Sequence, residues 1–324
     1  MVSDMQQDNC VTISLIIATC NRPDSLLCCL ESLNIHGILA REDIEVIIVE
    51  NGSNDKDAYH FRHDYNIVYL SQDIPHLSLA INLGIKSSKG KYIAFTDDDV
   101  VISDSTWLDK LHDNFLDNSN LGYASGNVLA AQTDSEVQLI WERKGGLSKG
   151  NQRMTFTQEY LSSFDPKWRI SKVAAGANSM IPREILNEIG YFPTFLGRGA
   201  PIEHGNTLEI VYRIIKAGYE LVYDPSAVVF HYHPETPWRL RKKMYIYGMG
   251  DVCYQLYIYF EYKDWRYLYG ATIRHFKFIL GNILMGLIGK YPMPASYRIF
   301  SLFGSLVGFP IFLIKYTLWR TQHE

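Results

Sequence analysis

The sequence predicts an α/β fold, in which a mostly parallel, twisted sheet is flanked by helices and followed by a helical C-terminal extension. Short β-branched stretches alternate with helical patterns over most of the chain, as in parallel-sheet proteins. The 324 residues are 47% hydrophobic, which is enough for a sizeable core. The composition changes near Pro237, where basic and aromatic residues become dense. We therefore expect a disordered segment at 1–10, a folded α/β unit at 11–236 and a tail at 237–324.

The first strand, loop and helix begin at Val11. The β-rich apolar stretch 13–18 predicts a strand, and the polar residues 21–23 predict a turn. A helix should follow, with its inner face formed by Leu26, Leu27, Leu30 and Leu33.

The later elements repeat this alternation. Strands are expected at 45–49, 66–70 and 91–97, and a helix at 77–88. Farther along we expect a helix at 105–115, a strand at 122–130 and a polar excursion at 131–172. A strand and a helix should follow around Pro182. The next helix should bury Leu208, Val211, Ile214 and Ile215, and two short strands should then end near His231.

Acidic residues follow two of the predicted strands. Glu50 ends one strand, and Asp97, Asp98 and Asp99 end another. Parallel sheets bind ligands beyond the carboxyl ends of their strands, so these carboxylates should share one site. Adjacent like charges repel, which indicates a cation or a hydroxyl-bearing ligand at this edge.

The overall charge and the cysteines exclude several classes of protein. The net charge of −4 gives no reason to expect a nucleic-acid partner. Five cysteines, without a CxxC spacing, fit neither a disulfide framework nor a zinc site. No secretory signal precedes Val11, so a reduced, cytoplasmic setting is expected.

The tail indicates contact with a membrane. A basic cluster at 239–243 precedes a segment rich in aromatic residues, 245–269, and two apolar runs, 276–288 and 299–314. Neither run reaches the roughly 20 apolar residues of a comfortable transmembrane helix, and the second contains Pro310. We expect the tail to lie in or on a bilayer. A short or broken span, and packing against the α/β unit, are the alternatives.

With these elements placed, the chain resembles the family 2 glycosyltransferases with a GT-A fold. The matching stretches occur in the order of the family and span residues 11–233. They are "SLIIATCNRPDSLLCCLESL", "EVIIVENGSND", "LSLAINLGIKSSKGKYIAFTDDDV", "AAGANSMIPREILNEIGYF" and "GYELVYDPSAVVFHYH".

The resemblance implies that the acidic cluster binds a nucleoside diphosphate sugar through Mn²⁺ or Mg²⁺. Asp99 would be a metal ligand, Asp98 would bind the ribose, and Asp97 would support them. His231 matches a position where some related enzymes supply a histidine to the metal. The remaining nucleotide-binding positions of the family fall on Thr19, Asn21, Arg22, Glu50 and Asn82. Glu50 stands where the family usually has an aspartate that binds the base, typically uracil.

The general base departs from the family pattern. Inverting enzymes deprotonate the acceptor hydroxyl with a side chain of suitable pKa. In the resembled family this base is usually the aspartate of an "ED" pair, but Asn206 and Thr207 stand there. Glu209 is the first replacement candidate and Glu203 the second. In the alternative interpretation, Glu209 pairs with Arg213 four residues later on a solvated face of the helix.

These observations predict a metal-dependent, inverting transferase that moves a sugar, expected to be UDP-linked, to a lipid-linked or polysaccharide acceptor. It would work peripherally at the cytoplasmic face of a membrane, whose anionic head groups suit the basic cluster. The missing base leaves two alternatives open: a retaining transferase, and a catalytically impaired scaffold that binds nucleotide sugars.

Overall fold

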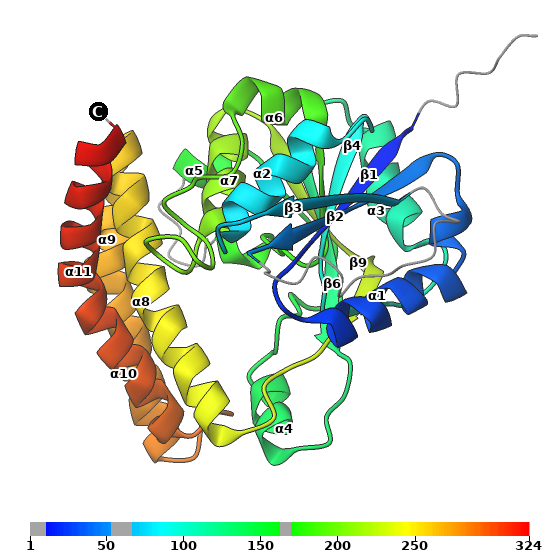
Figure 1. The fold of residues 1–324 in the computed structure, drawn as a ribbon. Helices are drawn as coiled ribbons and strands as arrows, with labels where there is room; N and C mark the ends of the chain where they lie inside the picture. The colour runs from blue at the N-terminus through cyan, green and yellow to red at the C-terminus, as the bar shows by residue number, and fades with distance from the viewer. Residues whose placement is uncertain (1–10, 53–66, 163–169, 324) are drawn as a thin grey trace, which may run out of the picture.

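The structure, a computed structural model, describes residues 11–52, 67–162 and 170–323. The segment expected to be disordered, 1–10, lies outside them. In the described part, nine strands form one sheet, in the order β3-β2-β1-β4-β8-β6-β9-β5 with β7 paired to β9 (Figure 1). The strands are β1 Ile13–Thr19, β2 Ile44–Asn51, β3 Ile67–Gln72, β4 Tyr92–Asp97, β5 Val100–Ile102, β6 Leu121–Ala130, β7 Met154–Phe156, β8 Ser179–Pro182 and β9 Glu220–His231.

The strand directions confirm the expected fold class. Strands β1 to β4 are mutually parallel, and β6 and β9 share their direction, whereas β5, β7 and β8 run the opposite way. The prediction of two short strands before His231 was wrong, because β9 is continuous. Its pairing with β6 shifts register between Gly126 and Asn127. The residues Asp224-Pro225-Ser226, whose sequence is typical of a turn, therefore form an irregularity within one strand.

Helices cover both faces of the sheet (Figure 1). They are α1 Pro23–Ile35, α2 Leu77–Ser87, α3 Trp107–Leu116, α4 Glu136–Arg143, α5 Glu159–Ser162, α6 Arg183–Ile189 and α7 Asn206–Lys216, with short 3-10 turns η1 Ile38–Ala40 and η2 Ile170–Lys172. Leu27, expected on the inner face of α1, is 44% exposed. Cys29 is buried instead, because it continues the helical stripe of Leu26, Leu30 and Leu33.

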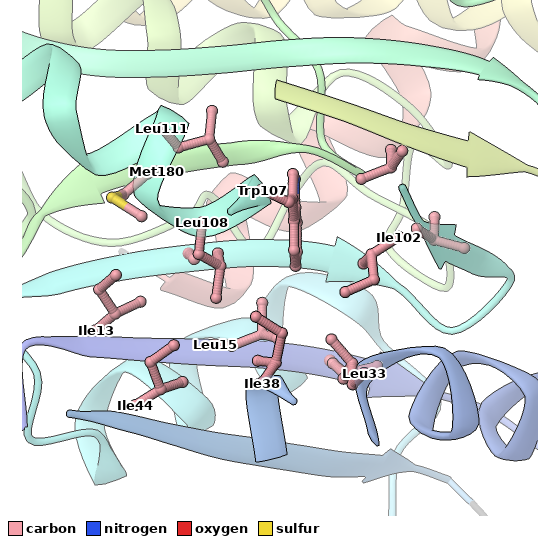
Figure 2. Packing of buried hydrophobic residues seen from close by; sticks show 14 of the residues in the cluster. Ile13, Leu15, Leu33, Ile38, Ile44, Ile102, Trp107, Leu108, Leu111 and Met180 are labelled. Carbon is pink, nitrogen blue, oxygen red and sulfur yellow. The ribbon is translucent and has the colours of Figure 1, made fainter. Parts of the chain in front are cut away.

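The core beneath the site packs α1 and α3 against the sheet (Figure 2). Trp107 is fully buried, and its Nε1 donates a hydrogen bond of 2.9 Å to Asn178 Oδ1. The Asn178 amide in turn donates to the carbonyls of Asn127 in β6 and Ala227 in β9. Burying each large apolar side chain stabilises the fold by about 1.5–3 kcal/mol. This polar link fixes the neighbouring strands in register.

The tail is mostly helical and packs against the α/β unit. Helices α8 and α11 lie side by side (Figure 1). The elements are α8 Pro237–Tyr262, α9 Trp265–Tyr269, the π-helical turn η3 Gly270–Arg274, α10 His275–Leu287 and α11 Ala295–His323. Tyr212 of α7 donates to Asp264 at 3.1 Å, and Lys315 donates to the Pro201 carbonyl at 2.6 Å. Packing against the α/β unit, an alternative considered for the tail, is therefore present on one face.

The opposite face of the tail is apolar and exposed. Helix α11 is uninterrupted, with Pro310 inside it, so a helix broken at this proline, which one of the alternatives implied, is not present. By length and composition the stretch Ala295–Gln322 could cross a membrane, and about a third of its most apolar window is buried in the structure. The exposed large side chains on α10 and α11 are Phe278, Leu280, Leu284, Met285, Leu287, Ile299, Phe303, Leu306, Val307, Leu313, Ile314 and Leu318.

Candidate functional site

The register of the parallel strands gathers the predicted site residues at one edge of the sheet. Thr19 pairs with Glu50 across β1 and β2, and Ala18 pairs with Asp97 across β1 and β4. These strands all end at the edge where parallel sheets bind ligands. The sequence-based expectation of a shared acidic edge thus agrees with the register of the sheet.

Thr19 and Arg22 hold two of the aspartates. Thr19 Oγ1 donates to Asp98 Oδ2 at 2.7 Å, and Asp98 is fully buried. The Arg22 guanidinium forks between Asp98 and Asp99, with a distance of 2.8 Å from Nη1 to Asp99 Oδ2. Such charge-assisted bonds orient carboxylates strongly. The three-aspartate run is therefore tied to the loop that follows β1.

His231 reaches the aspartates because β5 and β9 pair in antiparallel fashion. Val100, directly after Asp99, pairs with His231, and the Tyr232 amide donates to the Asp99 carbonyl at 3.2 Å. His231 Nε2 lies 3.2 Å from Asp99 Oδ1 and 3.6 Å from Asp97 Oδ2. His231 was predicted from the sequence, whereas β5 was not, because its three residues are too short for a periodic signal.

These three side chains fit a divalent metal. The ligand atoms of Asp97, Asp99 and His231 lie within 4.8 Å of one another. Asp99 Oδ1 is buried and accepts no hydrogen bond from the described residues. His231 Nδ1 lies 2.7 Å from the Tyr232 carbonyl, which favours the tautomer with a free lone pair on Nε2. Two carboxylates and one imidazole suit Mn²⁺ well, whereas Mg²⁺ prefers oxygen ligands alone.

The pKa values in the cluster reflect burial and charge together. Burial raises the pKa of Asp98 to about 6, although Arg22 and Thr19 oppose the shift. Burial acts to lower the pKa of His231, but the nearby carboxylates of Asp97 and Asp99 raise it overall. The negative potential of the aspartates therefore prevails at His231, and the same potential attracts a cation.

Glu50 and Asn21 lie at the borders of the acidic cluster. Glu50 is 2% exposed at the end of β2, and it pairs with Ser71 of the neighbouring strand β3. Asn21 has a φ of 51° and is exposed. A left-handed asparagine is typical of tight turns, so Asn21 shapes the loop between β1 and α1.

Asn82 makes a structural contact. Its Nδ2 donates to the Phe192 carbonyl at 2.9 Å, and its Oδ1 accepts from the Phe192 amide at 2.9 Å. This pair of bonds ties α2 to the segment after α6. Both ends of the amide are thus engaged with backbone in this structure.

The region expected to supply the base contains two very different glutamates. Glu209 is 1% exposed, and its carboxylate lies 2.8 Å from Arg213 Nε and accepts a hydrogen bond from Tyr262 of α8. Burial raises the pKa of Glu209, against the opposing influence of Arg213 and Tyr262. Glu203 is exposed in the loop before α7. Asn206, at the first position of α7, is buried.

Comparisons with known proteins identify a matching family and two similar solved structures. The family model "Glycosyl transferase family 2" matches residues 14–190. A mannosyltransferase of Pyrobaculum calidifontis, solved with GDP-Man and Mn²⁺, is similar in fold, with a TM-score of 0.60 and 13% identity over 92% of this chain and 86% of that one. TarS of S. aureus has a TM-score of 0.50 and 14% identity, over 74% of this chain and 40% of TarS.

A curated relative matches a shorter region. The minor teichoic acid biosynthesis protein GgaB of Bacillus subtilis (strain 168) is 34% identical over 88 residues, which is 26% of this chain. The match spans about a tenth of the length of that relative.

Proposed function

Because the chain belongs to the family 2 glycosyl transferases, we propose that it moves a sugar from a nucleoside diphosphate sugar to an acceptor in a metal-dependent, inverting reaction. The observation that carries this proposal is the grouping of Asp97, Asp99 and His231, whose ligand atoms lie within 4.8 Å of one another beyond the ends of β4 and β9. A site of this composition can hold the metal that a diphosphate leaving group requires.

In the proposed reaction, the residues of the cluster have separate roles. Asp99 and His231 hold Mn²⁺, with Mg²⁺ as a weaker fit, and Asp97 completes the set. The bound metal neutralises the charge that develops on the leaving diphosphate. Asp98, fixed by Thr19 and Arg22, binds the ribose. Because Arg22 engages Asp98 and Asp99 together, it also sets the distance between the ribose and the metal ligands.

The nucleotide base would lie against Glu50. Its carboxylate can accept the N–H of a uracil ring, which supports a UDP-linked donor. Asn21 supports the turn that surrounds the nucleotide. The contacts of Asn82 with Phe192 give it a positioning role, because they fasten α2 beside the donor site.

For the general base we propose Glu203, and for Glu209 a positioning role. The contacts of Glu209 with Arg213 and Tyr262 fasten α7 to α8 and engage its carboxylate. The carboxylate of Glu203 is exposed, close in sequence to the buried start of α7. An exposed carboxylate can accept a proton from an acceptor hydroxyl if the acceptor brings the two within hydrogen-bond distance.

The acceptor is proposed to be lipid-linked or a polysaccharide, at the cytoplasmic surface of a membrane. The exposed apolar side chains of α10 and α11 support this, since a concentration of exposed apolar residues is typical of membrane or protein contact. The solved mannosyltransferase was studied in complex with GDP-Man, which supports a nucleoside diphosphate sugar as the donor class.

The test is to incubate the protein with Mn²⁺ and a panel of nucleoside diphosphate sugars, with membrane lipids as acceptor, and to follow release of the diphosphate. Turnover should appear with one donor and fall by about 100-fold or more in Asp99→Asn. Asp117→Asn, which changes an exposed carboxylate at the end of α3, is the matched control.

A catalytically impaired scaffold is the second candidate. It is favoured by Asn206 at the usual base position and by the engaged carboxylate of Glu209. Metal-dependent donor binding without turnover, for every donor and acceptor tried, would favour this alternative. Absence of donor binding would contradict both candidates.

A further inference from the structure

A cavity of about 300 Å³ lies between α4, η2 and the tail helices α8, α10 and α11. It is separate from the acidic cluster, because none of the aspartates 97–99 lines it. Its walls come from both the α/β unit and the tail. Any ligand in it would therefore contact the two parts of the chain together.

Three buried polar atoms in the wall have no hydrogen-bond partner among the described residues. They are Arg298 Nε, Ser301 Oγ and Tyr267 OH, and each of these residues is at most 5% exposed. Arg298 also donates from Nη2 to Tyr291 OH. Leaving a buried donor unsatisfied costs about 1–3 kcal/mol, so a ligand that supplied acceptors to these cavity-lining residues would be stabilised by them.

Positive charge gathers at the same place. Lys144 lines the cavity, and its Nζ lies 4.1 Å from the centroid of the Trp141 ring. Lys243 Nζ lies 4.3 Å from that centroid. Burial, together with the charges of Arg298 and Lys243, lowers the pKa of Lys144 to about 7. Asp251 is the acidic residue in the wall, and its Oδ1 lies 3.5 Å from His204 Nε2. A group of cations that repel one another is suited to an anion with several acceptor oxygens.

The cavity also connects with the apolar face of the tail. Phe278 of α10 lines the cavity and is 39% exposed. It belongs to the same exposed apolar face of α10 and α11 that is described above. An anion attached to an apolar chain could thus place its charged group among the cations and its chain along that face.

A row of rings joins the cavity to the metal-ligand cluster. The His231 and His233 rings are stacked with centroids 5.4 Å apart, and the centroids of His233 and Trp141 are 6.1 Å apart. Trp141 carries the two lysines on its faces. A ligand in the cavity would therefore lie on the side of the α/β unit that also carries the proposed metal.

We propose that this cavity binds the phosphate group of a lipid-linked acceptor. Arg298, Ser301 and Tyr267 would donate hydrogen bonds to the phosphate oxygens, and Lys144 would supply charge. The identification of the ligand as an acceptor rests on the proposed function, whereas phosphate binding itself does not.

Binding is tested by isothermal titration calorimetry of the full chain in detergent micelles. The probes are farnesyl phosphate, farnesol and inorganic phosphate. Farnesyl phosphate should bind at least tenfold more tightly than either of the others. Lys144→Gln, which changes the lysine that lines the cavity, should weaken its binding by about tenfold, which is the effect of one lost charge-assisted contact.

The chain offers matched controls. Arg143 and Lys242 are exposed neighbours of Lys144 and Lys243, so Arg143→Gln and Lys242→Gln remove equal charge outside the cavity and should leave binding unchanged. Arg298→Gln should abolish binding, with circular dichroism to verify folding. Glutamine at position 144 keeps a long side chain against Trp141, so Lys144→Gln keeps the test valid if Arg298→Gln fails to fold.

Several results would overturn the proposal. If farnesol bound as tightly as farnesyl phosphate, the cavity would not recognise the phosphate group. If inorganic phosphate bound as tightly, the cavity would not recognise the apolar chain. Equal losses in the cavity variants and their controls would show non-specific charge attraction. Asp99→Asn separates this test from that of the proposed function: it should lower donor turnover by about 100-fold or more but leave farnesyl phosphate binding unchanged. Farnesyl phosphate binding without donor turnover in the wild type would contradict the proposed function alone, and donor turnover without farnesyl phosphate binding would contradict the cavity proposal alone.

Discussion

His231 Nε2 lies 3.2 Å from Asp99 Oδ1, although the two residues are far apart in the chain. The pairing of β5 with β9 fixes this distance, because it sets Val100 opposite His231. Nδ1 of His231 is engaged with the Tyr232 carbonyl, so Nε2 is the nitrogen that faces the carboxylates. This geometry makes His231 a residue whose contribution to metal affinity can be measured directly.

His231→Ala should weaken Mn²⁺ binding by at least about tenfold, because one of three ligands is lost. Electron paramagnetic resonance of free Mn²⁺ measures this without any sugar donor. His36→Ala, at the end of α1, is the control. Unchanged affinity in His231→Ala would assign the histidine a role in orienting Asp99 instead.

Substitutions of the two glutamates near α7 should differ in their effects on the free energy of unfolding and on kcat. Glu209→Gln should lower the free energy of unfolding by about 3 kcal/mol, because it leaves Arg213 without its buried charge partner. Glu203→Gln should leave stability unchanged and lower kcat by about 100-fold. Urea unfolding and steady-state kinetics together check this. A large loss of kcat in well-folded Glu209→Gln, with none in Glu203→Gln, would reverse the assignment.

Asn82→Leu should destabilise the fold by about 2 kcal/mol, since the amide and carbonyl of Phe192 lose their partner. Thermal unfolding measures the loss. The KM for the donor should stay close to that of the wild type if Asn82 only positions α2. A rise in KM without a loss of stability would instead support direct contact with the nucleotide.

Stability should depend on pH through Lys144. A lysine whose pKa is about 7 in the folded chain and near 10.5 when unfolded binds fewer protons in the folded state between these values. The free energy of unfolding should then rise with pH across this window and fall as the pH drops toward 7. Lys243, Arg298, Lys149 and Asp251 are the charged groups that act on it.

Urea unfolding at pH 7.5 and 9.5 tests this linkage. The difference between the two pH values should shrink in Lys144→Gln and persist in Arg143→Gln, since only the first variant removes the shifted group. Identical pH dependence in all three proteins would show that Lys144 keeps an ordinary pKa.

The exposed face of α11 should bind membranes. Leu306 is 53% exposed on α11, and Leu116 is 64% exposed on α3. Leu306→Glu should reduce co-sedimentation with phosphatidylglycerol vesicles, because a charge enters the apolar face. Leu116→Glu should not. Equal sedimentation of both variants with the wild type would place the membrane contact elsewhere.

The alternation of strands and helices could be predicted from the sequence because each element has a clear period. The acidic edge followed from the same reasoning, since parallel strands end together. β5 could not be predicted, because three residues that pair with a strand more than a hundred positions away have no local pattern. The continuity of β9 was hidden by Pro225, which reads as a turn but is accommodated within the strand.

The contacts of Glu209 illustrate a second limit. The helical spacing showed that Arg213 could pair with it, and this pair is present. The hydrogen bond from Tyr262 joins α7 to α8, and no pattern within α7 reveals it. In the same way Pro310 indicates a break in a helix, yet packing against α8 keeps α11 continuous.

The place of β5 in the sheet has a consequence for the order of folding. Among the described strands, β5 pairs with β9 alone. During synthesis, Asp97 to Asp99 emerge well before the residues of β9, so their final arrangement must wait for a long-range contact, which forms slowly. A ribosome-bound chain that stops before Glu220 should therefore contain the first strands and the acidic run but lack the arrangement that selects a metal. Under the proposed function, metal uptake would therefore be a late event in the maturation of the chain.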